Sequence, residues 1–354
     1  MKATILVRGV QSVHRAVVTV GIVSLLISAP GISLQSGGAL DRHSKSRGQP
    51  AMSAYPLPAP PVEPPPCVRV PIGPPPPPLP PPSIPESSVP FVAAVGPRRI
   101  SLEALRGKGI WITVFPGDPV NVSSLVETAR RARLQSLYVR TGSTHDGFYG
   151  GPMLKRLVPL AHRYGIAVIA WDFPTLSNPA RDAERAAEAF RYGVDAFSPD
   201  IEEEPEGTYI TARRVVYYLS LVRKDAGTHP VIATVPRPTS LSLAHYPYAQ
   251  EAPFVDAFAP MVYWSCTEPG AAVAVALEAL RPLRPVVPIG QDYNMGSEGG
   301  PVGLPSGLEV WRFIDVARRD GALGVSLYDL ESGGPVQLAA LTRFPWTRTS
   351  RKTG

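Results

Sequence analysis

The stretch GVDAFSPDIEEEPEGTY, residues 193–209, places a run of acids directly after a short apolar segment. The apolar part, 194–197, is typical of a buried strand, and the acids begin with Asp200 and Glu202. Neighbouring carboxylates repel one another, so acids at the end of a buried strand form either a solvated turn or a functional site. The remainder of the chain decides which interpretation has the better support.

Short apolar runs alternate with helical stretches throughout residues 101–346. Runs that are apolar on both faces and separated by helices indicate parallel strands covered on both sides. Eight such units predict an α/β fold of the (β/α)8 TIM-barrel type, which typically needs ~250 residues. An open doubly wound sheet is the alternative, but no GxGxxG or Walker loop follows an early run. The predicted strands are 109–115, 134–141, 165–173, 194–202, 230–236, 255–264, 285–293 and 321–331.

The N-terminal part of the chain has a different composition. Residues 1–39 combine a basic start with a 14-residue apolar run, 16–29, and predict a signal peptide or membrane anchor. Residues 40–100 contain 20 of the 43 prolines and predict a disordered, proline-rich spacer. A barrel domain over 101–346 and a basic tail over 347–354 follow. The expected location is therefore secreted or cell-envelope associated, with membrane or envelope attachment through the N-terminal segment.

Charge and cysteine usage limit the partners of the chain. The formal net charge is +6, but residues 1–100 carry all of it, so the barrel has no basic surface for nucleic acid. Two cysteines, Cys67 and Cys266, cannot build a zinc site, and the histidines show no HxH or HExxH spacing. No metal or cofactor is predicted. The two cysteines either pair or remain free thiols, and the oligomeric state is left open.

Polar and aromatic side chains follow most of the predicted strands. The C-terminal strand ends carry the active site of a (β/α)8 barrel, so these side chains are the candidate site residues. The candidate catalytic residues are Asp200, Glu202, Tyr263, Asp292 and Asp329. The candidate substrate-binding residues are Arg140, Trp171, Asp172, Trp264, Gln291, Tyr293, Tyr328 and Glu331.

The spacing of Asp200 and Glu202 indicates a catalytic pair. Residues i and i+2 of a strand point to the same side, so the two carboxyl groups are expected to lie together. Close carboxylates raise each other's proton affinity, and a carboxyl that stays protonated near neutral pH can act as a general acid. Rings at the strand ends can stack on sugars, although some of them are expected only to cap the barrel core.

Two motifs resemble those of the chitinase-type (family 18) glycoside hydrolases. DAFSPDIE, residues 195–202, is similar to the D-x-x-D-x-D-x-E signature of that family, with Ser198 in place of one Asp. MVYW, residues 261–264, is similar to its M-x-Y-D motif, with Trp264 in place of the Asp, and Tyr328 stands where the family has a tryptophan. The resemblance covers the strands that bear the site rather than continuous sequence.

The resemblance implies that Glu202 is the general acid on the glycosidic oxygen of an amino-sugar glycan. It also implies that Asp200 and Tyr263 hold a substrate N-acetyl group that acts as the internal nucleophile. An ordinary two-carboxylate route, with Asp292 or Asp329 as nucleophile or base, is the alternative. Two other functions are also considered, a barrel that binds cell-wall glycan without cleaving it and a purely structural barrel.

Overall fold

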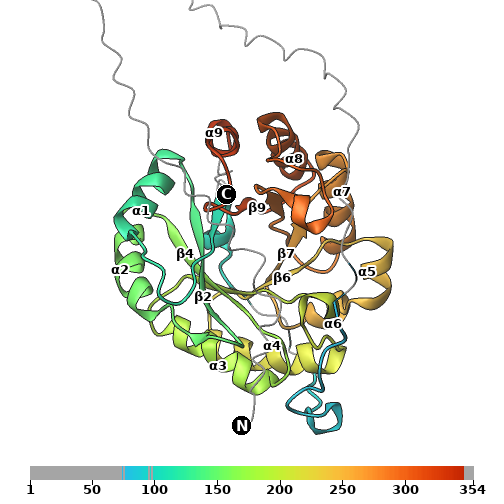
Figure 1. Cartoon of the computed structure of the whole chain (residues 1–354). Coiled ribbons are helices and arrows are strands. Elements are labelled where there is room, and N and C mark those ends of the chain that lie inside the picture. Colours follow the sequence, from blue (N-terminus) through green and yellow to red (C-terminus); the bar gives the residue numbers. More distant parts are fainter. Residues whose placement is uncertain (1–73, 75, 95, 97–98, 347–354) are drawn as a thin grey trace, which may run out of the picture. The chain divides into compact units, whose positions relative to one another are not determined.

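The computed structural model describes residues 74, 76–94, 96 and 99–346, so the segments predicted over 1–39 and 347–354 lie outside it. Within the described part, eight parallel strands alternate with helices, and the predicted (β/α)8 barrel is confirmed (Figure 1). A short strand, β3 (Gly147–Phe148), pairs antiparallel with β2. The parallel strands are β1 (Gly107–Ile112), β2 (Ser136–Ser143), β4 (Ala167–Phe173), β5 (Ala196–Pro199), β6 (Ile232–Pro236), β7 (Ala257–Val262), β8 (Ile289–Gln291) and β9 (Gly324–Tyr328).

The sheet closes on itself in chain order. The ladder runs β5-β4-β2-β1-β9-β8-β7-β6, and two isolated bridges, Phe197↔Val231 and Asp200↔Thr234, join β5 to β6. Because these strands are all parallel, their carboxyl ends meet at one end of the barrel, although the register of β2 with β4 shifts between Arg140 and Gly142. The second bridge places Asp200 at that end.

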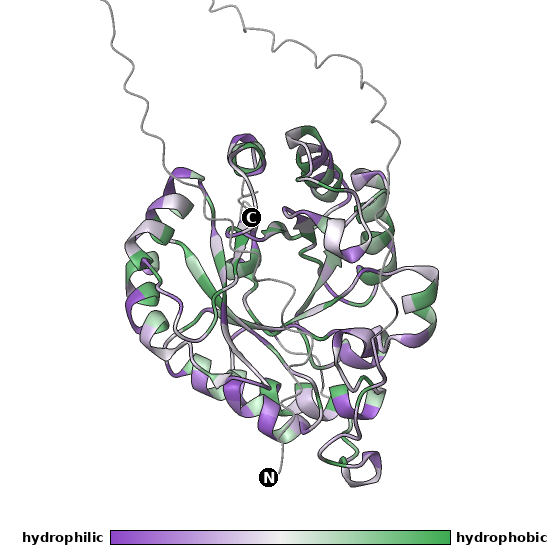
Figure 2. Ribbon diagram, in the orientation of Figure 1, coloured by the Kyte–Doolittle hydropathy of each residue, from purple (hydrophilic) through white to green (hydrophobic). Residues whose placement is uncertain are grey.

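Helices cover the outside of the barrel. Asn121, Asn178 and Thr211 cap three of them, since each side chain accepts a hydrogen bond from a backbone N–H of the first turn. Apolar residues concentrate on the strands and on the helix sides that face them (Figure 2). The helices are α1 (Val122–Arg131), α2 (Gly151–His162), α3 (Pro179–Phe190), α4 (Ala212–Ala226), α5 (Ser240–His245), α6 (Tyr248–Glu251), α7 (Pro269–Leu280), α8 (Gly307–Arg319) and α9 (Pro335–Arg343).

The barrel has two apolar layers, one between strands and helices and one inside the barrel. The inner layer contains Trp111 and Tyr138, whose rings stack at 4.7 Å between centroids. Gly109 makes this stacking possible, because a Cβ there would lie 2.8 Å from the Tyr138 ring. We call Trp111, Tyr138 and Trp171 the aromatic floor; all three are at most 2% exposed and fill the inside of the barrel.

Residues 80–91, which we call the strap, pack against α4 and the loop before it. Glu86, in a 3-10 turn over Glu86–Ser88, pairs with Arg214 at 2.8 Å and accepts from the Thr211 hydroxyl at 2.8 Å. Tyr209 donates to the Pro80 carbonyl at 2.6 Å. The expectation of a spacer without packing therefore does not hold for the strap, and the remaining spacer proposal concerns the residues before it.

Cys266 is disulfide-bonded, whereas Cys67 lies outside the described residues. The pairing of these two cysteines therefore stays a prediction. In the described ranges, no helix is both long and apolar enough to cross a membrane.

Candidate functional site

The Asp200 carboxyl lies where β5 ends, at the carboxyl end of the barrel. Backbone hydrogen bonds hold the position from both sides: the Asp200 N–H donates to the Asp172 carbonyl at 2.9 Å, and the Ile201 N–H donates to the Thr234 carbonyl at 3.0 Å. One carboxyl oxygen of Asp200 is buried without a hydrogen-bond partner. Burial raises the pKa of Asp200 to about 7, and the positive charge of Arg140 opposes that increase.

Glu202 lies beside Asp200 and holds its proton tightly. Burial raises the pKa of Glu202 well above its ordinary value, and the negative charge of Asp200 adds to that increase. The pKa of Tyr263 is also raised, first by burial and then by neighbouring rings and these two acids. Asp200, Glu202 and Tyr263 therefore form one electrostatic group, in which Glu202 can donate a proton near neutral pH.

Aromatic rings surround this group. Tyr328 is the centre of the set, with ring centroids at 5.9 Å from both Tyr263 and Tyr293 and at 6.4 Å from Trp171. The Thr113 hydroxyl donates to the Tyr328 hydroxyl at 3.3 Å, which ties β1 to β9. Rings with polar handles around a proton donor are suited to contact the apolar faces and hydroxyl groups of a sugar.

Arg140, within β2, supplies a positive charge to the same region. Its guanidinium lies over the ring of Phe115 at 4.6 Å and over the ring of Trp171 at 5.4 Å. The residue is 7% exposed. Arg140 is therefore buried against two rings, and its role as a ligand contact stays a proposal.

Asp292 and Asp329 form a second acidic group. The Asp292 carboxyl is nearly enclosed, and burial followed by the charge of Asp329 raises its pKa to about 8. Asp329 accepts from the backbone N–H of Ser332 at 3.0 Å and from its hydroxyl. A Cβ at Gly333 would lie 2.4 Å from the Asp292 carboxyl, so both acids face the loop that leads to α9.

Glu331 belongs to this second region. It accepts from the Thr113 backbone N–H at 2.9 Å. Loss of solvation around the carboxyl raises its pKa to about 7, and the charge of Asp329 adds to the increase, although the residue as a whole is exposed. The sequence placed Asp292 and Asp329 opposite Glu202, whereas the acids that raise the pKa of Glu202 are Asp200, Glu206, Glu203 and Glu298.

Three predicted substrate contacts have structural partners within the protein. Asp172 is fully buried and pairs with Arg185 of α3 at 2.5 Å, and Trp264 packs on Phe313 of α8 at 5.5 Å between centroids. Asp172 follows the inward-facing Trp171, and Trp264 follows the inward-facing Tyr263. Because consecutive strand residues point to opposite sides, Asp172 and Trp264 face the helices. Gln291 binds loop backbone, accepting from Ser265 N at 3.1 Å and donating to the Tyr293 carbonyl at 3.2 Å. Asp172 and Trp264 therefore lie outside the expected cleft, whereas a substrate contact by Gln291 stays a prediction.

Sequence reasoning missed Glu298, Thr113 and Phe115. Glu298 accepts from the Tyr293 hydroxyl at 2.7 Å and contributes to the raised pKa of Glu202. It lies in the 3-10 turn Met295–Glu298, five residues after Tyr293. The only sequence signal for it is that an acid occurs in the loop after a predicted strand. Thr113 and Phe115 follow β1 at its carboxyl end. No candidate site residue was predicted from the sequence at the end of this strand.

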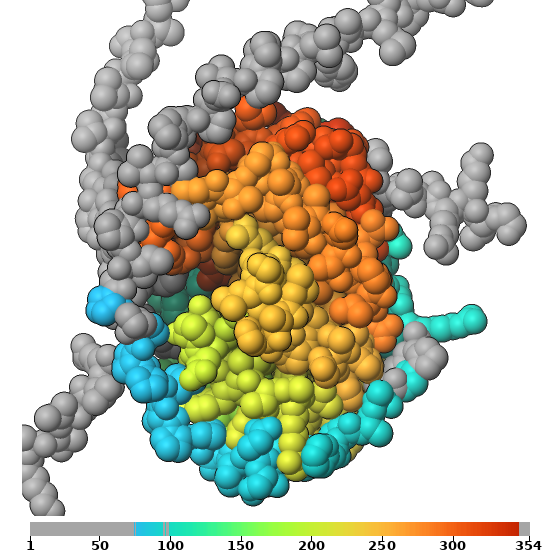
Figure 3. All heavy atoms as spheres, turned by 90° about the vertical axis from the view of Figure 1, so that its right-hand side faces the viewer, coloured from blue at the N-terminus to red at the C-terminus, as the bar shows by residue number. Residues whose placement is uncertain are grey.

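A hollow opens on this part of the surface. In Figure 3 it is bordered by the yellow-green segment after β5, the yellow segment after β6 and the orange segment after β8. Those loops carry or adjoin Glu202, Arg237 and Glu298. Nowhere in the described chain do three or more His, Cys, Asp or Glu side chains form a group that could hold a metal.

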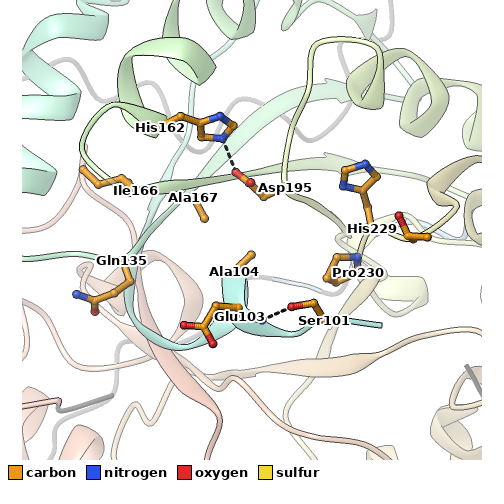
Figure 4. Close-up of a pocket in the computed structure, with 12 residues that line it drawn as sticks. Ser101, Glu103, Ala104, Gln135, His162, Ile166, Ala167, Asp195, His229 and Pro230 are labelled. Carbon is orange, nitrogen blue, oxygen red and sulfur yellow. Dashed lines mark hydrogen bonds and ion pairs between the residues drawn. The ribbon is translucent and has the colours of Figure 1, made fainter. Parts of the chain in front are cut away.

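A separate cavity of about 420 Å³ lies at the amino-terminal ends of the strands (Figure 4). His162 and Asp195 meet there at 2.8 Å, and the Asp195 carboxyl also accepts from the Val168 N–H at 2.7 Å. Asp195, the first acid of the matched motif, is therefore at the opposite end of β5 from Glu202, and its contacts join α2, β4 and β5.

No family model and no curated protein matches the chain. Among solved structures, the spore cortex-lytic enzyme SleL of Bacillus cereus has a TM-score of 0.51 at 11% identity, covering 69% of this chain and 76% of that chain. A chitinase of Chromobacterium violaceum has a TM-score of 0.51 at 10% identity, covering 67% and 98%. A beta-galactosidase of Marinomonas ef1 also has 0.51 at 10% identity, covering 67% and 58%.

These likenesses concern the fold. The chain is a (β/α)8 barrel, a fold that it shares with these glycoside hydrolases. Identities near one residue in ten do not transfer an activity, so the reaction has to be argued from the side chains of the site.

Proposed function

We propose that this protein is a glycoside hydrolase that cleaves an amino-sugar-containing glycan of a cell wall or envelope. One observation carries the proposal: Glu202, with a pKa raised by burial and by Asp200, lies at the carboxyl end of β5 among tyrosine rings. A protonated carboxyl at the active end of a barrel is the group that glycoside cleavage needs as its acid. The N-terminal segments support a secreted or surface-held protein.

In the proposed reaction, Glu202 gives its proton to the glycosidic oxygen as the bond to the anomeric carbon breaks. The carbonyl oxygen of the substrate N-acetyl group attacks that carbon, while Asp200 and the Tyr263 hydroxyl orient the group. Water then opens the cyclic intermediate, and Glu202 takes up the proton as general base. Aromatic side chains next to the acids would hold the sugar ring.

This substrate-assisted route has better support than the two-carboxylate route. The latter needs a second carboxyl on the other side of the bond, ~5 to 9.5 Å from the acid. Asp292 and Asp329 are directed at the loop before α9, where Ser332 engages Asp329. Asp200 and Tyr263, in contrast, are electrostatic neighbours of Glu202.

A non-catalytic, glycan-binding barrel is the second candidate, and Ser198 favours it. Its hydroxyl bonds with the Thr234 hydroxyl at 2.8 Å and donates to the Ile232 carbonyl at 3.1 Å. The resembling family has an acid at this position, and a hydroxyl engaged in this way supplies no charge to the pair above it.

Glu202→Gln tests the proposal directly. The change keeps the shape of the side chain and removes the proton donor, so turnover of a cleaved substrate should fall by ~10² to 10⁴-fold with binding retained. Reducing-end-labelled chitin oligomers and peptidoglycan fragments form the substrate panel. Glu204→Gln, at an exposed position of the same acidic run, is the matched control and should leave the rate unchanged.

Equal losses in both variants would mean that the acidic run acts as a diffuse field rather than through one proton donor. A wild-type protein that binds the oligomers but cleaves none of them would establish the glycan-binding candidate instead.

A further inference from the structure

Arg140 is a buried arginine without an acidic partner. Its Nε atom is enclosed and has no hydrogen-bond partner, and within the described residues the guanidinium makes no ion pair. Its contacts are the rings of Phe115 and Trp171. Other arginines of comparable burial are paired: Arg185 with Asp172 and Arg214 with Glu86.

The two rings stabilise the charge of Arg140 but do not use its donors. A ring attracts a guanidinium through the negative face of its π system, whereas the N–H groups lie in the guanidinium plane and point past the ring. Leaving such donors unsatisfied in a buried position costs free energy. An anionic ligand group in that plane would remove the cost.

The charge of Arg140 reaches the acids and rings at the reacting end of the barrel. Its charge acts on Asp200, Tyr149, Tyr328 and Asp172, and Asp200 is the neighbour of the proposed acid. The backbone register pairs Arg140 with Trp171, whose ring lies near Tyr328. A sugar held above these rings would bring its substituents to the guanidinium.

We propose that Arg140 binds the carboxylate of an acidic sugar, so that the glycan acted on here is carboxylate-bearing. This inference rests on the proposed function of the same site. A guanidinium matches a carboxylate with two parallel hydrogen bonds. A singly charged group is favoured over a phosphate dianion, because the acids at the carboxyl end of the barrel repel a second negative charge.

Two kinds of sugar present this group, a uronic acid and an amino sugar with an acidic ether substituent. The test therefore uses three tetrasaccharides, measured by calorimetry in a Glu202→Gln background that prevents turnover. One alternates N-acetylglucosamine with glucuronate, one alternates N-acetylglucosamine with N-acetylmuramate, and the neutral chitin tetrasaccharide is the reference.

Arg140→Gln should weaken binding of at least one acidic tetrasaccharide by roughly 10- to 100-fold, the usual worth of a charge-assisted bond. Binding of the neutral one should change less than about twofold, a difference under 0.5 kcal/mol. Arg140→Lys keeps the positive charge but cannot form two parallel hydrogen bonds, so it should recover part of the lost affinity. This recovery would also show that the loss in Arg140→Gln is not caused by misfolding. Arg163→Gln, an exposed arginine of the α2 end, is the control and should change nothing.

Equal weakening of all three ligands by Arg140→Gln would overturn the inference, because Arg140 would then shape the cleft or balance Asp200. Binding of the neutral tetrasaccharide without any preference for an acidic one would also overturn it, while leaving the proposed function intact. Failure of all three to bind the background variant would remove the proposed function and this inference together.

Discussion

Replacing Asp292 by asparagine removes a carboxyl group whose ionisation the fold opposes. Asp292 is 1% exposed, and its Oδ1 atom has no hydrogen-bond partner. Burial is the main cause of its pKa of about 8, the charge of Asp329 adds to it, and a backbone N–H of Gly334 works against it. The ordinary value, 3.8, applies in the unfolded chain.

The direction of the pH effect follows from these two pKa values. Below about pH 4 the carboxyl is protonated in both states and costs nothing. As the pH rises toward 8, the unfolded chain releases the proton while the folded chain keeps it, so the free energy of unfolding falls. At 1.36 kcal/mol per unit, the loss at pH 7 is about 4 kcal/mol, and it levels off above pH 8.

Asp292→Asn should therefore be more stable than the wild type by roughly 1 to 4 kcal/mol at pH 7, less than the full penalty because the amide is also buried. Urea unfolding at pH 5, 7 and 8.5 measures this, and the gain should grow with pH. Asp225→Asn, at an exposed position of α4, is the control. A variant that is less stable at pH 8.5, or a gain that is equal at all three values, would refute the reasoning.

Two further predictions concern the strap and the disulfide. Glu86→Gln should lower the free energy of unfolding by about 1 to 2 kcal/mol, because the buried Arg214 loses its counter-charge while Glu86 itself is half exposed. The melting temperature should fall by several degrees, and an unchanged value would mean that the strap adds no stability. For the cysteines, digestion without reduction should yield one peptide that contains Cys67 and Cys266, and recovery of two free thiols would contradict the pairing.

The barrel could be predicted from the sequence because each strand run is apolar on both faces and each is followed by a helix. All eight runs correspond to strands, including VDAFSPDIE, where β5 is Ala196–Pro199. The placement of Asp200 at the carboxyl end follows from the same alternation of apolar runs and helical stretches. These features depend on local pattern, which a single sequence displays.

Side-chain direction was harder to predict than strand position. The sequence assigned both Trp171 and Asp172 to the cleft, although consecutive strand residues point to opposite sides. The same applies to Tyr263 and Trp264. Strict alternation, counted from the apolar residues of each run, would have sent Asp172 and Trp264 to the helix layer.

Contacts between distant segments had no local signal. The proline content of the strap predicts an extended chain but not its partner, because Arg214 and Tyr209 lie more than a hundred residues away. Glu298 meets Tyr293 only through the turn between them. The contacts of Asp292 and Asp329 likewise depend on where the loop before α9 lies.

The aromatic floor packs inside a barrel whose two ends carry different groups. Trp111, Tyr138 and Trp171 pack inside the barrel and are each at most 2% exposed, while the cavity with His162 and Asp195 lies at one end of the strands and Glu202 at the other. An inhibitor, a label or a set of substitutions placed at the amino-terminal cavity would then leave the chemistry above the floor untouched. The two ends can accordingly be engineered as independent modules of one scaffold.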